Sequence, residues 1–173
     1  MTETCVPLSP IIGLLVWSVK RGHGSFLTME FGNPNLEVRE PVVSSLSAMP
    51  KVTEALARRH VSIKGTWHFW VQDAVWGVSV GSKKCRYDSD NKVVDDVLKN
   101  LDGQRLIAIN VADGTRELVL DFDLGGVLDI SPLPEQLSSG LDVWSLHQWE
   151  GDIISSSQKG VISIEKRTMA ASP

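Results

Sequence analysis

The chain has 173 residues, a formal net charge of -4, and a composition that is 42% hydrophobic and 22% charged. This length and balance favour one compact domain over residues 1–173 and exclude a disordered, collagen-like or coiled-coil chain. The longest apolar run, residues 11–17, is far shorter than the roughly 20 residues that span a bilayer. An acid at position 3 and basic residues only after that run argue against a signal peptide, so we expect a cytoplasmic protein without membrane association.

Strand signals dominate the chain. Runs of alternating or β-branched residues are separated by Gly, Asn, Asp and Pro, a pattern that predicts short strands joined by turns. The expected strands are residues 14–20, 25–31, 36–39, 61–63, 66–72, 75–80, 106–111, 117–122, 127–130, 143–149, 153–156 and 161–165. Connections as short as residues 21–24 and 112–115 favour antiparallel pairing of consecutive strands.

Two segments have helical character. Residues 51–59 follow Pro50, which suits an early helical position, and they consist mostly of good helix formers. Residues 91–101 follow Asp90, a favourable capping residue, and their valines and leucines recur at helical spacing before Gly103. We therefore expect a mainly β, α+β fold: an antiparallel β-sandwich or strongly curved sheets with about two helices.

The two halves of the chain match each other loosely. Residues 14–38 and 106–130 each contain an apolar strand, a turn and two short motifs with a central acid, and a Trp-bearing strand follows in both halves. One hypothesis is an internal duplication of a β unit, with halves 11–86 and 102–166 joined by the helix 91–101. The alternative is a chance similarity between acidic-aromatic strands.

The turn around His23 is the first functional candidate. His23 lies between two glycines, with Arg21 before it and Ser25 after it, so the three side chains could orient an anion or share acid–base chemistry. The alternative is a tight turn in which the glycines supply positive φ. Ser25 lacks the Gly-x-Ser-x-Gly pattern of a nucleophile elbow, which weakens a hydrolytic reading.

Tryptophan is unusually frequent, with six Trp against one Tyr. In the expected strand 66–72, alternation places Trp67 and Phe69 on one face and His68 and Trp70 on the other. Such a strand is either covered on both sides or offers one aromatic face to a ligand or partner, which makes Trp70 a binding candidate. Nearby cations also fit a nucleic-acid platform, but the acidic chain lacks an RNA-binding motif, so nucleic acid is the less favoured partner.

Charge is distributed unevenly along the chain. Residues 1–86 carry ten Lys and Arg against six Asp and Glu, whereas residues 87–173 carry seven against fifteen. The acidic half either complements the other half within the fold or docks on a basic partner. The binding candidates are Asp121, Asp123 and Asp129, of which the first two are expected on one strand face, where they could equally face water.

No motif predicts a metal site or a cofactor. Cys5 and Cys85 are too few for a disulfide framework or a structural zinc site, although the cations flanking Cys85 would favour its thiolate. The four histidines form no close ligand motif, and the chain has neither a phosphate loop nor a dinucleotide fingerprint in its βαβ setting.

The C-terminal part of the chain carries a weak family resemblance. Leu101-Asp102-Gly103-Gln104-Arg105-Leu106, then Leu118–Phe122 and Trp144-Ser145-Leu146, form a layout that resembles small bacterial domains, some of them similar to immunity proteins of polymorphic toxin systems. The leading hypothesis is therefore a non-catalytic protein-binding domain, of immunity type, that neutralises a basic toxin through its acidic surface. The alternative is an enzyme or small-ligand-binding protein using the His23 loop. A homodimer formed by an exposed edge strand also remains open.

Overall fold

The structure is a computed structural model that describes residues 3–4, 6–42, 49–111, 116–134 and 138–167. Its elements in chain order are β1 (Glu3–Thr4), the 3-10 helix η1 (Val6–Ile11), β2 (Val16–Arg21), β3 (Leu27–Arg39), α1 (Pro50–Leu56), β4 (His60–Val71), β5 (Ala74–Val80), β6 (Lys83–Arg86), α2 (Asn91–Leu101), β7 (Leu106–Val111), β8 (Leu118–Phe122), β9 (Gly126–Pro132), β10 (Trp144–Gln148), β11 (Ile153–Ser156) and β12 (Ile162–Glu165). The predicted mainly β fold with two helices is confirmed for this part of the chain.

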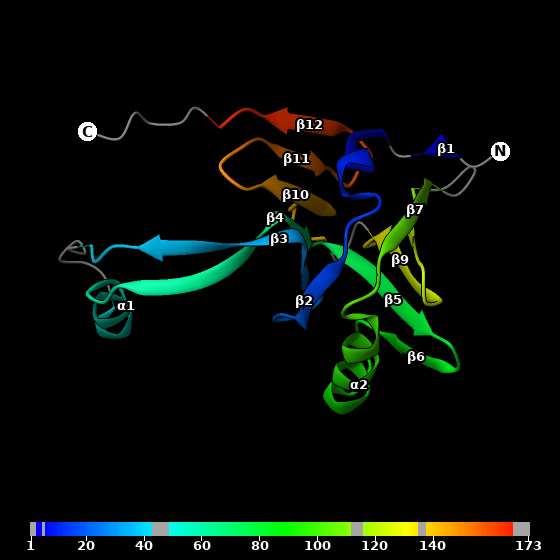
Figure 1. The fold of residues 1–173 in the computed structure, drawn as a ribbon, viewed down its shortest axis with the longest axis horizontal. Helices are drawn as coiled ribbons and strands as arrows, with labels where there is room; N and C mark the ends of the chain where they lie inside the picture. The colour runs from blue at the N-terminus through cyan, green and yellow to red at the C-terminus, as the bar shows by residue number, and fades with distance from the viewer. Residues whose placement is uncertain (1–2, 5, 43–48, 112–115, 135–137, 168–173) are drawn as a thin grey trace.

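The strands form two antiparallel sheets (Figure 1). The first sheet has the order β1-β7-β8-β9-β5-β6, and the second has the order β12-β11-β10-β4-β3-β2. Each sheet therefore combines strands from both ends of the sequence: β5 and β6 extend β7–β9, while β10–β12 extend β2–β4. Neither half of the chain completes a sheet by itself.

The hydrophobic core joins both sheets with η1 and α2. In β8 and β9, alternate side chains are buried in it, as the period of two in a strand requires. Fully buried members of the core include Phe31 and Phe69 from the second sheet and Trp76 and Leu120 from the first. The helix α2 covers one side of this core with its buried residues Val94, Val97, Leu98 and Leu101.

The helix predicted at residues 91–101 is confirmed with the same bounds. The side chain of Asp90 accepts a hydrogen bond of 2.9 Å from the backbone N–H of Lys92, so it caps the first turn as expected. The other predicted helix ends earlier, at Leu56 instead of residue 59, and none of its residues is buried. None of the helices in the described ranges is long and apolar enough to cross a membrane.

Two pairs of expected strands are in fact continuous. The segments 25–31 and 36–39 belong to β3, and the segments 61–63 and 66–72 belong to β4, because the two strands pair with each other along almost their whole length. The glycine and asparagine between the expected strands form a β-bulge, at which the register shifts between Phe31 and Pro34 and Gly32 has a φ of +79°. The sequence also gave no signal for β1, η1 or β6.

The long hairpin of β3 and β4 projects from the rest of the molecule (Figure 1). Its distal part consists of residues 34–42 and 49–65, which we call the arm, and it carries α1 at its end. Beyond the bulge, β3 pairs with β4 alone, from Pro34 opposite Gly65 to Arg39 opposite His60. The arm is thus a two-stranded ribbon, which in water has little stability of its own.

The two halves supply strands to both sheets in a similar way. In the first half β2–β4 are neighbours and the chain then crosses to β5 and β6; in the second half β7–β9 are neighbours and the chain then crosses to β10 and β11. The residue match differs, because residues 36–38 lie on the same strand as residues 29–31, whereas residues 128–130 lie on the strand after residues 120–122. The internal duplication therefore stays a prediction.

Candidate functional site

The outward face of the second sheet gathers polar and aromatic side chains from three neighbouring strands. Glu30 on β3 lies opposite His68 on β4, which lies opposite His147 on β10. Thr28, Trp70 and Ser145 form the adjacent row across the same strands. Side chains directly opposite each other on one face of a sheet are close enough to interact, so the strand register assembles this cluster.

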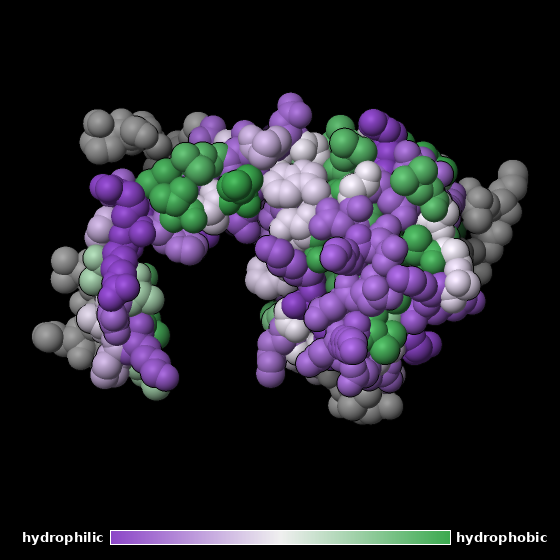
Figure 2. Space-filling view, turned by 60° about the horizontal axis from the view of Figure 1, so that its bottom comes forward, coloured by the Kyte–Doolittle hydropathy of each residue, from purple (hydrophilic) through white to green (hydrophobic). Residues whose placement is uncertain are grey.

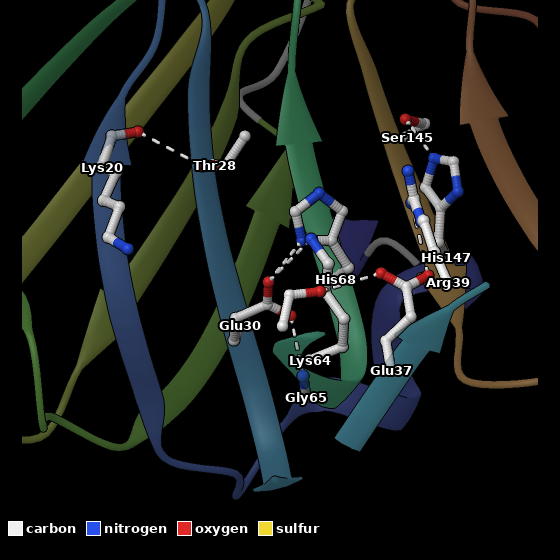
Figure 3. Close-up of polar contacts among 11 residues, drawn as sticks. Lys20, Thr28, Glu30, Glu37, Arg39, Lys64, Gly65, His68, Ser145 and His147 are labelled. Atoms are coloured by element: carbon white, nitrogen blue, oxygen red, sulfur yellow. Dashed lines mark hydrogen bonds and ion pairs between the residues drawn. The ribbon is translucent and has the colours of Figure 1, made fainter. Parts of the chain in front are cut away.

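Glu30 is the buried acid of the cluster and is only 5% exposed. Its Oε1 lies 2.8 Å from Nδ1 of His68 and 3.7 Å from Nζ of Lys64, and its Oε2 accepts a hydrogen bond of 2.8 Å from the backbone N–H of Gly65 (Figure 3). Burial by itself raises the pKa of Glu30, but the hydrogen bonds from His68 and Gly65 and the two neighbouring cationic groups outweigh it and lower that pKa. The carboxylate is therefore ionised at neutral pH, and it fixes the orientation of the His68 ring.

His147 continues the cluster on β10. Its Nε2 lies 2.9 Å from Oγ of Ser145, and its ring centroid lies 6.0 Å from that of His68 and 6.5 Å from that of Trp70. Burial lowers the pKa of His147, and electrostatic interactions with His68, Arg167 and Lys64 lower it further against the opposing effect of Glu165. His147 is therefore a neutral imidazole at neutral pH.

These groups do not form a hydrolytic triad. Glu30 is bonded to His68, whereas Ser145 is bonded to His147, so no single histidine connects a carboxylate to a hydroxyl. Ser145 is also only 3% exposed, and its hydroxyl accepts a hydrogen bond of 3.1 Å from the side chain of Gln72. The geometry supports binding at this face better than nucleophilic catalysis.

A cavity of about 390 Å³ opens beside the two histidines, between the base of the arm and the end of β10. We call it the polar cavity. Its lining comprises three cations, Arg39, Lys64 and Arg167, two carboxylates, Glu37 and Glu150, the aromatic side chains His68, Trp70, His147 and Trp149, and also Gly65 and Gln148. The volume is within the range of small-molecule sites.

The arm has one polar and one apolar face. Glu37 and Ser62, which lie opposite each other, are joined by a hydrogen bond of 3.0 Å, and Glu37 faces the polar cavity. The residues on either side of Glu37 and Ser62 along the strands form two directly opposed pairs, Leu36 with Ile63 and Val38 with Val61. We call these four residues the apolar stripe.

The apolar stripe is open to solvent. Leu36 is 63% exposed, Ile63 58%, Val61 52% and Val38 46%. A sheet face with this alternation normally lies against a core, but here no part of the described chain covers it. Figure 2 shows the arm standing apart from the body with apolar surface on it.

The charges of the arm are largely matched within the arm itself. Arg58 pairs with Glu54 at 2.8 Å, and Arg59 makes a two-pronged contact with Glu40 at 2.9 to 3.1 Å. Arg39 lies 3.3 Å from Glu37. All three glutamates of the arm are thus paired with its arginines, and the most distinctive property of the arm surface is its exposed aliphatic area.

The His23 loop has the geometry of a tight turn, closed by a hydrogen bond of 2.8 Å from Gly22 N–H to the carbonyl of Phe26. Arg21 Nη1 donates to the carbonyl of Ser89 and to Asn91, both at 3.0 Å. Ser25 Oγ donates to the carbonyl of Gln72 at 2.7 Å, and the carbonyl of Ser25 accepts from Nε1 of Trp76 at 2.6 Å. Two of the three predicted side chains thus tie the loop to the body, while His23 is exposed at its tip. The loop does not reach the polar cavity.

Trp70 lies where strand alternation places it, on the outward face with His68, while Trp67 packs against the core. The ring of Trp70 makes a T-shaped contact with that of Phe26, with 5.9 Å between the ring centroids. Within the described residues, its buried Nε1 has no hydrogen-bond partner. Of the predicted binding residues, Trp70 alone lines the polar cavity.

The predicted acids lie on the other sheet. Asp121 and Asp129 are half-buried on β8 and β9, and burial raises the pKa of Asp129 despite the nearby Arg86. The strand β8 ends at Phe122, so Asp123 does not share a strand face with Asp121 as expected. Instead, Asp123 Oδ1 accepts a hydrogen bond of 2.8 Å from the backbone N–H of Arg105.

Sequence reasoning missed Glu30, Lys64, Ser145, His147 and Arg167. They lie on four different segments and form no motif along the chain. For Glu30, Ser145 and His147, the available signal was the alternation that turns them away from buried neighbours.

The cations that flank Cys85 in the sequence do not lower the pKa of its thiol. The thiol is 4% exposed, and burial raises its pKa although Arg21 acts in the opposite direction. Cys5 and the predicted turn at residues 112–115 lie outside the described residues. Within those residues, no group of three or more His, Cys, Asp or Glu side chains is placed to hold a metal ion.

Comparison with known proteins adds no relative to this picture. No protein-family model, curated protein or solved structure matches the chain. The case for a function therefore rests on the geometry of the arm and of the polar cavity.

Proposed function

We propose that this protein is a non-catalytic protein-binding domain that holds a partner protein on the apolar stripe of its arm. The observation that carries the proposal is the set of directly opposed pairs Leu36–Ile63 and Val38–Val61, exposed on a ribbon that has no core beneath it. Burying an exposed aliphatic side chain completely contributes about 1.5–3 kcal/mol, so a partner that covers these four side chains would gain substantial binding free energy. A contiguous exposed apolar patch of this kind is typical of an interaction surface.

The chemistry of the arm defines the kind of partner. Because the arginines of the arm pair with its own glutamates, the contact is with an apolar surface of the partner and has little dependence on salt. Among the described residues, no further strand pairs with the outer edges of the ribbon beyond the bulge, which allows an extended segment of the partner to add a strand there.

The experiment compares capture of a partner by immobilised wild-type protein and by a double variant, Leu36→Ser with Ile63→Ser. Leu124→Ser is the matched control, because Leu124 is 73% exposed but lies in a turn of the first sheet. We expect a stoichiometric partner to be retained by the wild type and the control at both low and high salt, and to be lost from the double variant. Retention of the same partner by the folded double variant would overturn the proposal.

An immunity-type role is a specific form of this proposal, in which the partner is a basic toxin. Its support is the acidic second half of the chain and the family-like layout of the C-terminal part. A contact made by Asp121, Asp123 and Asp129 would weaken as salt rises, whereas a contact made by the apolar stripe would persist. Charge reversal of these acids, followed by titration of the captured partner at two salt concentrations, separates the two surfaces.

A further inference from the structure

The polar cavity is rich in hydrogen-bond donors that come from separate segments. Arg39 and Lys64 reach it from the two strands of the arm, and Arg167 reaches it from the segment after β12. Of the two carboxylates in the lining, Glu37 already accepts from Ser62 and pairs with Arg39. Glu30 is buried beside His68 and 3.7 Å from Lys64, but it is not part of the lining.

Electrostatics at the floor of the cavity favour a negative charge. After burial, the groups that lower the pKa of His147 are His68, Arg167 and Lys64, and Glu165 is the carboxylate that opposes them. The lining has three cations, Arg39, Lys64 and Arg167, against two carboxylates, so its potential is positive on balance. The same potential attracts an anion.

We propose that the polar cavity binds the oxyanion group of a small metabolite, a phosphate or a carboxylate, through Arg39, Lys64 and Arg167. Planar guanidinium groups bind both oxyanions with two parallel hydrogen bonds, and an ammonium group adds a point charge. Trp70 and Trp149 supply apolar walls for the remainder of the ligand. The volume of about 390 Å³ limits that ligand to a small molecule. The site uses none of the four residues of the apolar stripe.

Binding of the anion is coupled to protonation of His147. An anion beside the ring stabilises the imidazolium, so it raises the pKa of His147, and by reciprocity the anion binds more tightly as the pH falls through that titration. The charged groups around the ring are Glu30, His68 and Lys64 on the arm side and Glu150, Glu165 and Arg167 on the other.

The test is isothermal titration calorimetry of the full chain with pyrophosphate, with citrate and with the cation spermidine. We expect saturable one-to-one binding of at least one of the two anions and no binding of spermidine. The variant Arg39→Gln with Arg167→Gln weakens anion binding at least about tenfold, whereas Arg58→Gln, an arginine on the same arm but outside the cavity, leaves it unchanged. Binding of pyrophosphate alone identifies a phosphate site, and binding of citrate alone identifies a carboxylate site.

A second readout keeps the inference testable if the double arginine variant does not fold. Nuclear magnetic resonance titration of His147 in the wild type is expected to show a higher pKa with the bound anion than without it. Absence of saturable binding of both anions at mildly acidic pH, or an unchanged His147 titration at saturating anion, would overturn the inference. The variant Leu36→Ser with Ile63→Ser binds the anion like the wild type, so failure of the proposed protein-binding function is distinguishable from failure of this site.

Discussion

At the scale of single residues, the buried carboxylate of Glu30 decides how the outward face of the second sheet is organised. It holds the ring of His68, accepts from the backbone of Gly65 at the root of the arm and attracts Lys64. A buried donor or acceptor that loses its hydrogen-bond partner destabilises the protein by more than the net stabilisation that the hydrogen bond contributes. Glu30 therefore links the conformation of the arm to that of the polar cavity.

We predict that Glu30→Gln lowers the free energy of unfolding by about 2 kcal/mol at neutral pH. Because the pKa of Glu30 in the folded protein is below its ordinary value of 4.5, its contribution is present above that pH and is lost as the pH falls through the folded pKa. The difference between wild type and variant should shrink accordingly in urea unfolding at about pH 3 compared with about pH 7. A difference that is the same at both pH values contradicts this role of the carboxylate.

At the scale of elements, the arm depends on a close approach of two backbones at its root. A Cβ at Gly65 would lie 2.6 Å from the carbonyl oxygen of Phe31 and 2.9 Å from that of Trp67. Main-chain atoms in paired strands cannot move aside without breaking the ladder. Glycine at this position therefore lets β3 and β4 stay paired as they pass from the core into the arm.

We predict that Gly65→Ala destabilises the protein by roughly 1–3 kcal/mol through this overpacking. Gly77→Ala is the matched control in a paired strand, because the Cβ there would meet the carboxylate of Asp129 at 2.9 Å, and a side-chain end can move. Thermal unfolding of the two variants should place Gly65→Ala well below Gly77→Ala. Equal losses would show that the backbone contact at the root of the arm is not decisive.

At the scale of the whole molecule, both sheets need strands from both halves of the chain. The strand β5 pairs with β9, and β10 pairs with β4. In a separate half, these strands would lack their neighbours, and part of the hydrophobic core would be exposed to solvent. The N-terminal segment adds a further connection, because Leu14 and Leu106 are joined by a backbone hydrogen bond of 3.0 Å. The fold is therefore completed only when the full chain is present.

We predict that fragments 1–88 and 89–173 are unfolded when each is produced separately and regain strand structure when mixed. Circular dichroism of each fragment and of the mixture, followed by urea unfolding of the mixture, measures this directly. A cooperative unfolding transition in either fragment alone would show that a half folds independently and would favour the reading of the chain as two separate units.

Features with a short repeat could be predicted from the sequence. In α2, Val94, Val97, Leu98 and Leu101 recur at helical spacing and are buried as predicted, whereas Val93, which was predicted on the same face, is 46% exposed. Eleven consecutive residues therefore determined the helix and most of its buried face. Alternation likewise assigned Phe69 to the core and Trp70 to the outward face. The antiparallel, mainly β class followed from many such short runs.

The pairing of strands that are far apart in the sequence was decided by the tertiary structure alone. Gly32 and its neighbours resemble a turn locally, but β4 pairs across them and extends the hairpin into the arm. Glu30, His68 and His147 meet because three strands share one register, and register is fixed by the burial of the opposite face of the whole sheet. Local side-chain patterns specify which face of a strand is buried, but they carry no information on which strand lies beside it, and so the arm and the polar cavity emerged only with the complete fold.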